Sequence, residues 1–142
     1  MGGYRFLEHI SDLYIEAYGK NLNEAFKYAG IAMFAAMTNL NEVRPNKEFS
    51  IEVRGYDLKQ LLYNWLEELL YLHEVHNILF SKIEVSEIKK VNEEYILKAK
   101  AWGEEYDPTR HESKLAIKAP TYSLMEIVEE KNNVKLRFVL DI

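Results

Sequence analysis

Four consecutive residues near the start of the chain, His9, Ile10, Ser11 and Asp12, place an imidazole, a hydroxyl and a carboxylate between two apolar runs. A purely structural strand would carry aliphatic side chains at such positions. The H-I-S-D segment is therefore the first candidate site in the sequence. The alternative is a turn without chemistry, because Ser and Asp also hydrogen-bond to their own backbone and commonly separate two strands.

More oxygen donors lie at the other end of the sequence. Apolar residues alternate from Val134 to Leu140, as in a half-buried strand, and Asp141 and Ile142 follow in register. Chain ends usually fray, so a terminus held in a strand has its α-carboxylate at a fixed position. If this strand lies beside the one that follows Asp12, the carboxylates of Asp12, Asp141 and Ile142 converge and repel each other unless a cation neutralises them. Hard oxygen donors favour Ca²⁺, Mg²⁺ or Mn²⁺ over zinc.

Two other groups of histidines and charges are weaker candidates. The sequence H-E-V-H puts His73 and His76 three residues apart, whereas the zinc-protease motif needs them four apart. Histidines near the end of a helix are also favoured by the helix dipole alone. The polar segment 103–113 contains the pair Arg110 and His111. Such a loop is usually solvated surface, although loops on a rigid scaffold also carry function.

The composition limits the classes of protein. A chain of 142 residues fits one domain, residues 1–142, and the absence of cysteine excludes thiolate metal sites and disulfide scaffolds. No segment reads as a signal peptide or a membrane span, so we expect a soluble cytoplasmic protein without a membrane partner. The net charge is −5, from 18 basic and 23 acidic residues, which disfavours strong direct binding to nucleic acid.

The apolar periodicity predicts the elements that carry these residues. Asn21 with Glu24, and Asp57 with Gln60, have the spacing of capping boxes, which predicts helices that begin at Leu22 and Leu58, the second running to about His73. Period-two alternation predicts five strands and a C-terminal hairpin, at residues 13–18, 48–54, 79–85, 95–101, 115–119, 123–129 and 134–140. The predicted fold class is α+β, with two long helices on an antiparallel-rich sheet of six or seven strands.

Several short motifs, taken together, resemble the archease family. They are H-I-S-D-L-Y-I-E-A-Y-G at 9–19, D-L-K-Q-L-L-Y-N-W-L-E-E-L-L-Y at 57–71, A-W-G-E at 101–104, D-P-T-R-H at 107–111, K-A-P-T-Y-S at 118–123 and the terminal D-I. Their order and approximate spacing agree over the whole chain. The sequence departs from the family pattern at Ile10 and Ser11, where Thr and Ala are more usual, and at Ser123, where archaeal members often have His.

This resemblance implies an accessory protein rather than an enzyme. Archeases activate the GTP-dependent RNA ligase of the RtcB type in tRNA splicing, by promoting guanylylation of the ligase and hence multiple turnover. Carried over by motif, Asp12, Asp141 and Ile142 correspond to the site of a divalent metal (Ca, Mn or Mg), and Lys118 corresponds to the functional lysine. His9 and His111 match motif positions, and the resemblance implies that they would lie next to the metal ligands without binding the metal. GTP would reach the site only through the ligase.

Two other classes of function stay open from the residues alone. Clustered carboxylates also suit a stand-alone metal-dependent phosphohydrolase, although the sequence offers no persuasive nucleophile and no base beyond His9. A chaperone-like or tRNA-modification partner protein is the other alternative. Activity of the isolated protein on phosphoesters would favour the first, and ligase stimulation that survives neutralisation of both aspartates would favour the second.

Overall fold

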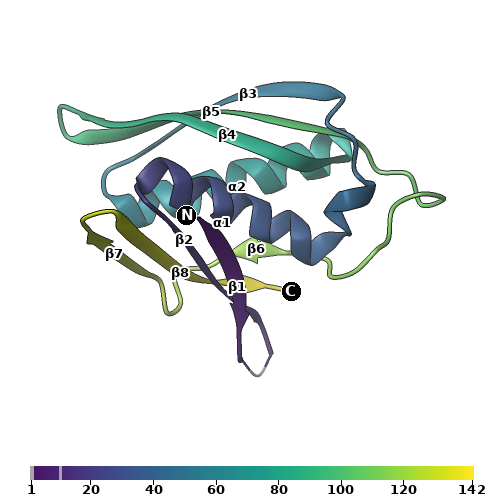
Figure 1. Ribbon diagram of the computed structural model, residues 1–142, viewed down its shortest axis with the longest axis horizontal. Helices are drawn as coiled ribbons and strands as arrows, with labels where there is room; N and C mark the ends of the chain where they lie inside the picture. Colours follow the sequence, from purple (N-terminus) through teal and green to yellow (C-terminus); the bar gives the residue numbers. More distant parts are fainter. Residues whose placement is uncertain (1, 10) are drawn as a thin grey trace.

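The chain folds into three layers, with two helices between two antiparallel sheets (Figure 1). The structure is a computed structural model that describes residues 2–9 and 11–142, so Ile10 of the H-I-S-D motif lies outside the described residues. The five-stranded sheet has the order β1-β2-β8-β6, with β7 also paired to β8, and the three-stranded sheet has the order β3-β5-β4. The strands are β1 (Gly3–Leu7), β2 (Leu13–Gly19), β6 (Ala119–Pro120), β7 (Glu126–Glu130) and β8 (Asn133–Asp141) in the first sheet, and β3 (Lys47–Gly55), β4 (Ile78–Val91) and β5 (Glu94–Glu105) in the second.

Both helices begin where the capping signals predict. Helix α1 (Leu22–Met37) starts after Asn21, whose side chain accepts a hydrogen bond from the Glu24 amide at 2.9 Å. Helix α2 (Leu58–His76) starts after Asp57, which accepts from the Gln60 amide at 2.8 Å. In both helices the third residue also accepts a bond from the backbone amide of the residue before the cap, Lys20 or Tyr56, a variant of the capping box, which uses the amide of the cap itself. Helix α2 continues one turn beyond the predicted end at His73 and stops at Asn77, which adopts the left-handed conformation.

The core lies on both sides of the helix layer. Helix α1 packs against β2 and β4, and α2 packs against β3 and β5. Trp65 of α2 is fully buried and donates its indole N–H to the Phe26 carbonyl of α1 at 2.9 Å, which fixes the two helices to each other. Because both faces of each helix are covered, a single apolar stripe is not enough, and α1 buries Ala, Phe, Gly and Met residues around most of its circumference.

The predicted fold class is confirmed, and the structure adds the division of the strands. The sequence predicts six or seven strands on one sheet, whereas the described residues form eight strands in two sheets. The pattern gives no signal for β1, since its five residues are only partly buried, and alternation along a strand cannot tell which sheet the strand joins. No helix within residues 2–9 and 11–142 is long and apolar enough to cross a membrane.

The predicted strand at 115–119 is wrong, because only Ala119 and Pro120 pair with β8. The amides of Lys114 and Leu115 donate instead to the carbonyls of Met37 and Ala36, at 2.9 and 3.1 Å. These carbonyls lie in the last turn of α1 and have no partner within the helix. Lys114 and Leu115 therefore cap α1, which takes these two amides out of any sheet ladder. The strand predicted at 123–129 likewise begins later, at Glu126, after a turn through Ser123 and Leu124.

Candidate functional site

Strands β2 and β8 bring the two candidate aspartates to the same end of the five-stranded sheet. The strands are antiparallel, and their last paired residues at this end are Leu13 and Leu140. Asp12 and Asp141 are the next residues on the two strands. By the alternation of β8, the Asp141 side chain lies on the outer face, away from the helices, whereas Asp12 lies in the bend just before β2. Side chains at opposed positions of antiparallel strands lie roughly 5 Å apart at Cβ, where like charges repel.

The end of the chain is held in place beside these aspartates. Strand β8 runs to Asp141, and the half-buried side chain of Ile142 packs against the core. Ile142 is therefore held in place by its side chain. Lys118 is fixed to the same place, because its amide donates to the Asp141 carbonyl at 2.7 Å. The structure thus pairs the strands next to Asp12 and Asp141 and bonds the backbone of Lys118 to Asp141, while the role of these residues and of Ile142 in a metal site stays a prediction.

The segment that carries Lys118 is anchored at both ends. On one side, residues 112–115 cap α1, and the buried hydroxyl of Thr38 donates to the Glu112 carbonyl at 2.7 Å. On the other side, the Thr121 amide and hydroxyl both donate to the Val139 carbonyl, at 3.1 and 2.8 Å. Tyr122 then stacks on Tyr63 of α2, with ring centroids 4.5 Å apart and planes 8° apart. A rigid frame therefore presents an exposed lysine.

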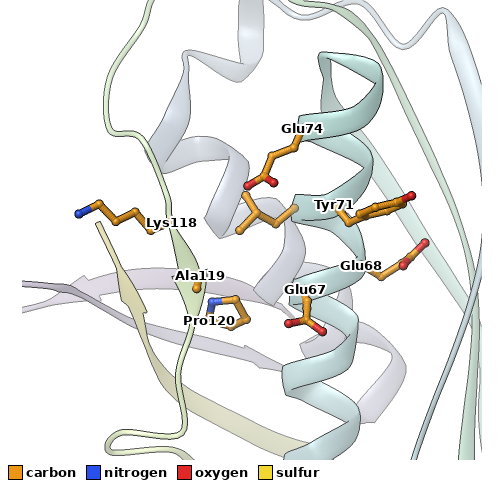
Figure 2. A pocket seen from close by; sticks show the side chains of 8 residues that line it. Glu67, Glu68, Tyr71, Glu74, Lys118, Ala119 and Pro120 are labelled. Carbon is orange, nitrogen blue, oxygen red and sulfur yellow. The ribbon is translucent and has the colours of Figure 1, made fainter.

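Lys118 lies at one end of an open groove of about 400 Å³ between α2 and β6. Figure 2 shows the carboxylates of Glu67 and Glu74 directed from α2 toward the segment that carries Ala119 and Pro120. The Lys118 side chain extends to the other side of this segment, and its ammonium points away from both glutamates (Figure 2). The lysine is therefore available to a molecule bound beside the end of β8.

The chain matches the sequence profile of the Archease protein family (MTH1598/TM1083) over residues 4–142. The chain belongs to the archease family. It is 43% identical to a protein archease of Sulfurisphaera tokodaii over 142 residues, which covers all of both chains. It is 44% identical to the protein archease of Pyrococcus abyssi over 127 residues, which covers 89% of each chain.

Two solved structures share this archease fold. The solution structure of Methanobacterium thermoautotrophicum protein 1598 matches with a TM-score of 0.86 and 38% identity, and the match covers 99% of both chains. The crystal structure of a Thermotoga maritima archease, described as a possible chaperone, matches with a TM-score of 0.61 and 15% identity. That match covers 96% of this chain and 94% of the other and shows similarity of fold alone.

The oxygen donors of this archease suit a hard cation. Asp12 is half-buried and Asp141 is exposed, so both carboxylates are accessible to a metal ion. Among residues 2–9 and 11–142, no three His, Asp or Glu side chains form a group that could hold a metal. The predicted site therefore depends on the Ile142 carboxylate as its third donor. Carboxylate oxygens alone favour Ca²⁺, Mg²⁺ or Mn²⁺.

The two histidines of the archease motifs have different surroundings. His9 is exposed in the connection between β1 and β2, with its ring edge-on to Tyr14 at 6.1 Å between centroids. It lies three residues before Asp12, so a role next to the metal ligands stays a prediction. His111 is buried, and both its ring nitrogens are in use: Nδ1 accepts from the Asp107 amide, and Nε2 is bonded to Glu104 Oε2, each at 2.9 Å. This geometry favours a structural role for His111 in the loop after β5.

Glu104 is the centre of that loop structure. Its carboxylate receives Arg110 Nη2, the Arg44 amide at 2.8 Å and His111 Nε2. Since Nδ1 of His111 accepts a backbone proton, Nε2 must be the donor to Glu104. The Arg110 hydrogen bond, opposed by burial and helped by the Arg44 amide and His111, lowers the pKa of Glu104 from 4.5 to about 2. The A-W-G-E and D-P-T-R-H motifs therefore meet in one buried network.

A second buried carboxylate, that of Glu16, lies on β2 in the five-stranded sheet that also carries Asp141. The sequence gives no indication that it is buried. It lies opposite Arg5 on β1 and Arg137 on β8 and is bonded to their Nε atoms at 2.8 and 2.9 Å. Burial raises the pKa of Glu16, but the two arginines outweigh burial and the net shift is downward. Such a row of charges across three strands is visible only when the register is known. It ties β1, β2 and β8 together four residues from Asp12 and Asp141.

Proposed function

We propose that this protein activates a GTP-dependent RNA ligase of the RtcB type, by promoting guanylylation of the ligase so that it turns over repeatedly in tRNA splicing. The proposal rests on membership of the archease family over residues 4–142 and on the placement of the candidate residues. The observation that carries most weight is the Lys118 amide bond to the Asp141 carbonyl, 2.7 Å long. The family resemblance implies that Lys118 is the functional lysine and Asp141 a metal ligand, and this bond holds the two residues next to each other.

In this proposal Asp12, Asp141 and the Ile142 carboxylate hold a divalent ion, Ca²⁺, Mn²⁺ or Mg²⁺. Such an ion, when bound, neutralises the carboxylates and attracts phosphate oxygens of a nucleotide. Lys118 presents an exposed ammonium beside it, which stabilises negative charge that develops on a phosphoryl group. The anchored segment 112–122 holds this charge in position before the ligase binds, so little ordering is needed on binding.

The acidic character of the chain indicates where it acts. With a net charge of −5, it competes poorly for the phosphate backbone of RNA. We therefore infer that it contacts the ligase and not the tRNA, and that GTP is bound through the ligase. The cytoplasm, where such a ligase would meet its tRNA substrates, is the proposed location.

RNA sealing by a cognate ligase under multiple-turnover conditions tests this proposal. The ligase alone should stop after roughly one round, and addition of this protein should restore repeated rounds. An unchanged yield would contradict the proposal. Release of phosphate by the purified protein alone would instead support a phosphohydrolase. Stimulation that persists in Asp12→Asn/Asp141→Asn would support the chaperone-like class.

A further inference from the structure

One wall of the groove between α2 and β6 is a face of α2 that carries glutamates. Glu67, Leu70, Tyr71 and Glu74 are spaced at i, i+3, i+4 and i+7, so they lie on one side of the helix. Glu67 and Glu74 are separated by two turns, about 10 Å along the axis. Figure 2 shows both carboxylates directed toward the opposite wall, which is formed by Ala119 and Pro120.

Among the described residues, these carboxylates form no ion pair with a basic side chain. Within residues 2–9 and 11–142, ion pairs neutralise Glu16, Glu48, Glu52, Glu84, Glu87, Glu94 and Glu104, but none involves Glu67, Glu68 or Glu74. Lys118 is the nearest basic residue of the groove, and its ammonium points away from both Glu67 and Glu74. Burial and the neighbouring charge of Glu67 raise the pKa of Glu68, as expected where negative charge is not compensated.

The floor and the rim of the groove are apolar. Leu70 and Pro120 are buried, and Tyr71 on the rim is 54% exposed. Outside the groove, two residues after Pro120, the pKa of Tyr122 is raised by burial and by the charges of Tyr63, Asp57 and Glu67. Tyr122 itself is 52% exposed. Exposed aromatic side chains beside charged ones are typical of protein interfaces.

The turn next to Tyr122 contains an unusual residue. Leu124 is 52% exposed and has φ of 55°, in the left-handed region that leucine avoids. A strained backbone that presents an apolar side chain to solvent costs stability without serving the core, and such strain is commonly kept where function needs it.

The occupant must complement both the charge and the apolar floor. A lysine or arginine side chain does so, because its methylene stem can lie on Leu70 and Pro120 while its charge lies between Glu67 and Glu74. A nucleic-acid phosphate would be repelled by these carboxylates. A second copy of the chain in a symmetric contact would bring the same carboxylates together.

We propose that the groove lined by Glu67, Leu70, Glu74 and Pro120 binds a basic segment of the partner protein. The inference rests on the proposed function for the identity of that partner, the RNA ligase. A segment seated in the groove would pass beside Lys118 and the end of β8. The contact would therefore place the ligase next to the residues proposed to act on guanylylation, without itself taking part in the chemistry.

Binding of a cognate ligase, measured by titration calorimetry at two salt concentrations, tests the groove. The test variant is Glu67→Gln/Glu74→Gln, which removes two charges and keeps the shapes of the side chains. Its control is Glu93→Gln/Glu129→Gln, which makes the same change of net charge at exposed positions outside the groove. Circular dichroism verifies that both variants fold. We expect the test variant to bind at least about tenfold more weakly, with a smaller salt dependence, and the control to bind within about twofold of wild type.

Each other result decides against the groove or against the proposed function. Equal weakening in both variants, or none in either, overturns the groove while ligase activation by wild type stands. Wild-type dimers that form at high concentration and disappear in the test variant would show that a second copy of the chain occupies the groove. This result would also overturn the proposal. If wild type binds no ligase, the proposed function is wrong. NMR titration with an acetylated tri-arginine peptide then tests whether the groove binds a basic segment at all. Shifts at Leu70 and Tyr71 in wild type, lost in the test variant, uphold the groove, and their absence overturns it.

Discussion

Lys118 and Lys114 are two exposed lysines on one segment, and we expect only Lys118 to be functional. Both Lys114 and Lys118 are exposed on the same anchored segment, but only Lys118 is bonded through its backbone to Asp141. If Lys118 places positive charge on a phosphoryl group, Lys118→Ala should slow ligase guanylylation by about 100-fold. Lys118→Arg should recover only part, because a planar guanidinium does not replace a compact ammonium. The rate of guanylylation measures both effects.

Lys114→Ala is the matched control for this series. It should leave the rate of guanylylation nearly unchanged, and neither substitution should alter folding, since both side chains are exposed. Equal loss from Lys114→Ala and Lys118→Ala would indicate a general charge effect on docking. No loss from Lys118→Ala would return the lysine to the role of a solvated surface residue.

Asp12 and Asp141 should bind the metal as a pair. Asp12→Asn and Asp141→Asn each remove one charged donor from a site that has only three, so each should weaken the affinity for Mn²⁺ or Ca²⁺ at least about tenfold. Titration calorimetry on the isolated protein measures this without any ligase. Binding equal to that of wild type in both variants would show that the metal site is elsewhere or absent.

At the scale of elements, the terminal strand should be functional as well as structural. A tag added after Ile142 would convert its carboxylate into an amide, while β8 stays paired with β2, β6 and β7. We expect metal affinity and ligase stimulation to fall together, with no change in the melting temperature. The control is the same tag at the N-terminus. Full stimulation by the C-terminally tagged protein would exclude the Ile142 carboxylate as a ligand.

The close packing of β4 on β5 explains the glycine of the A-W-G-E motif. A Cβ at Gly103 would lie 1.7 Å from the Leu79 carbonyl oxygen, where β4 has a bulge. Backbone cannot move aside as a side chain can, so Gly103→Ala should lower the free energy of unfolding by about 3 kcal/mol. Ser50→Ala, on the exposed side of β3, is the control and should change it by less than about 0.5 kcal/mol. Urea denaturation measures both, and a similar stability of the two variants would refute this explanation.

The sequence predicts those elements whose signals are local. Capping boxes at Asn21 and Asp57 give the starts of both helices, and period-two alternation gives the long strands. The segment 115–119 has the same alternation, but the amides at its start, those of Lys114 and Leu115, cap α1. No local pattern can reveal a partner nearly 80 residues away in the chain. The sequence places Asp12 and Asp141 each next to a strand, and only the structure shows that these two strands pair. Glu16 and Glu104 are missed as buried charges, since their partners are known only from the sheet register and the loop.

For the whole molecule, Glu104 makes stability depend on pH in the acid range. Its pKa is about 2 in the folded protein against 4.5 for an ordinary glutamate, because Arg110, the Arg44 amide and His111 bond to the charged form. A lowered pKa contributes stability that is fully present above pH 4.5 and is lost as pH falls toward 2. Thermal melts of wild type and Glu104→Gln should therefore differ clearly at pH 6 and converge near pH 2. A difference that does not change with pH would mean that lost packing, and not lost charge, destabilises the variant.

The central claim is that one site at the end of β8 acts on the first chemical step of the ligase. Single-turnover guanylylation of a cognate ligase with GTP, with and without this protein, measures that step directly. We expect wild type to raise the rate constant, Asp12→Asn/Asp141→Asn and Lys118→Ala to lose most of this effect, and Lys114→Ala to retain it. An equal rate constant with and without wild-type protein, or full stimulation by the Asp12→Asn/Asp141→Asn variant, would contradict the claim.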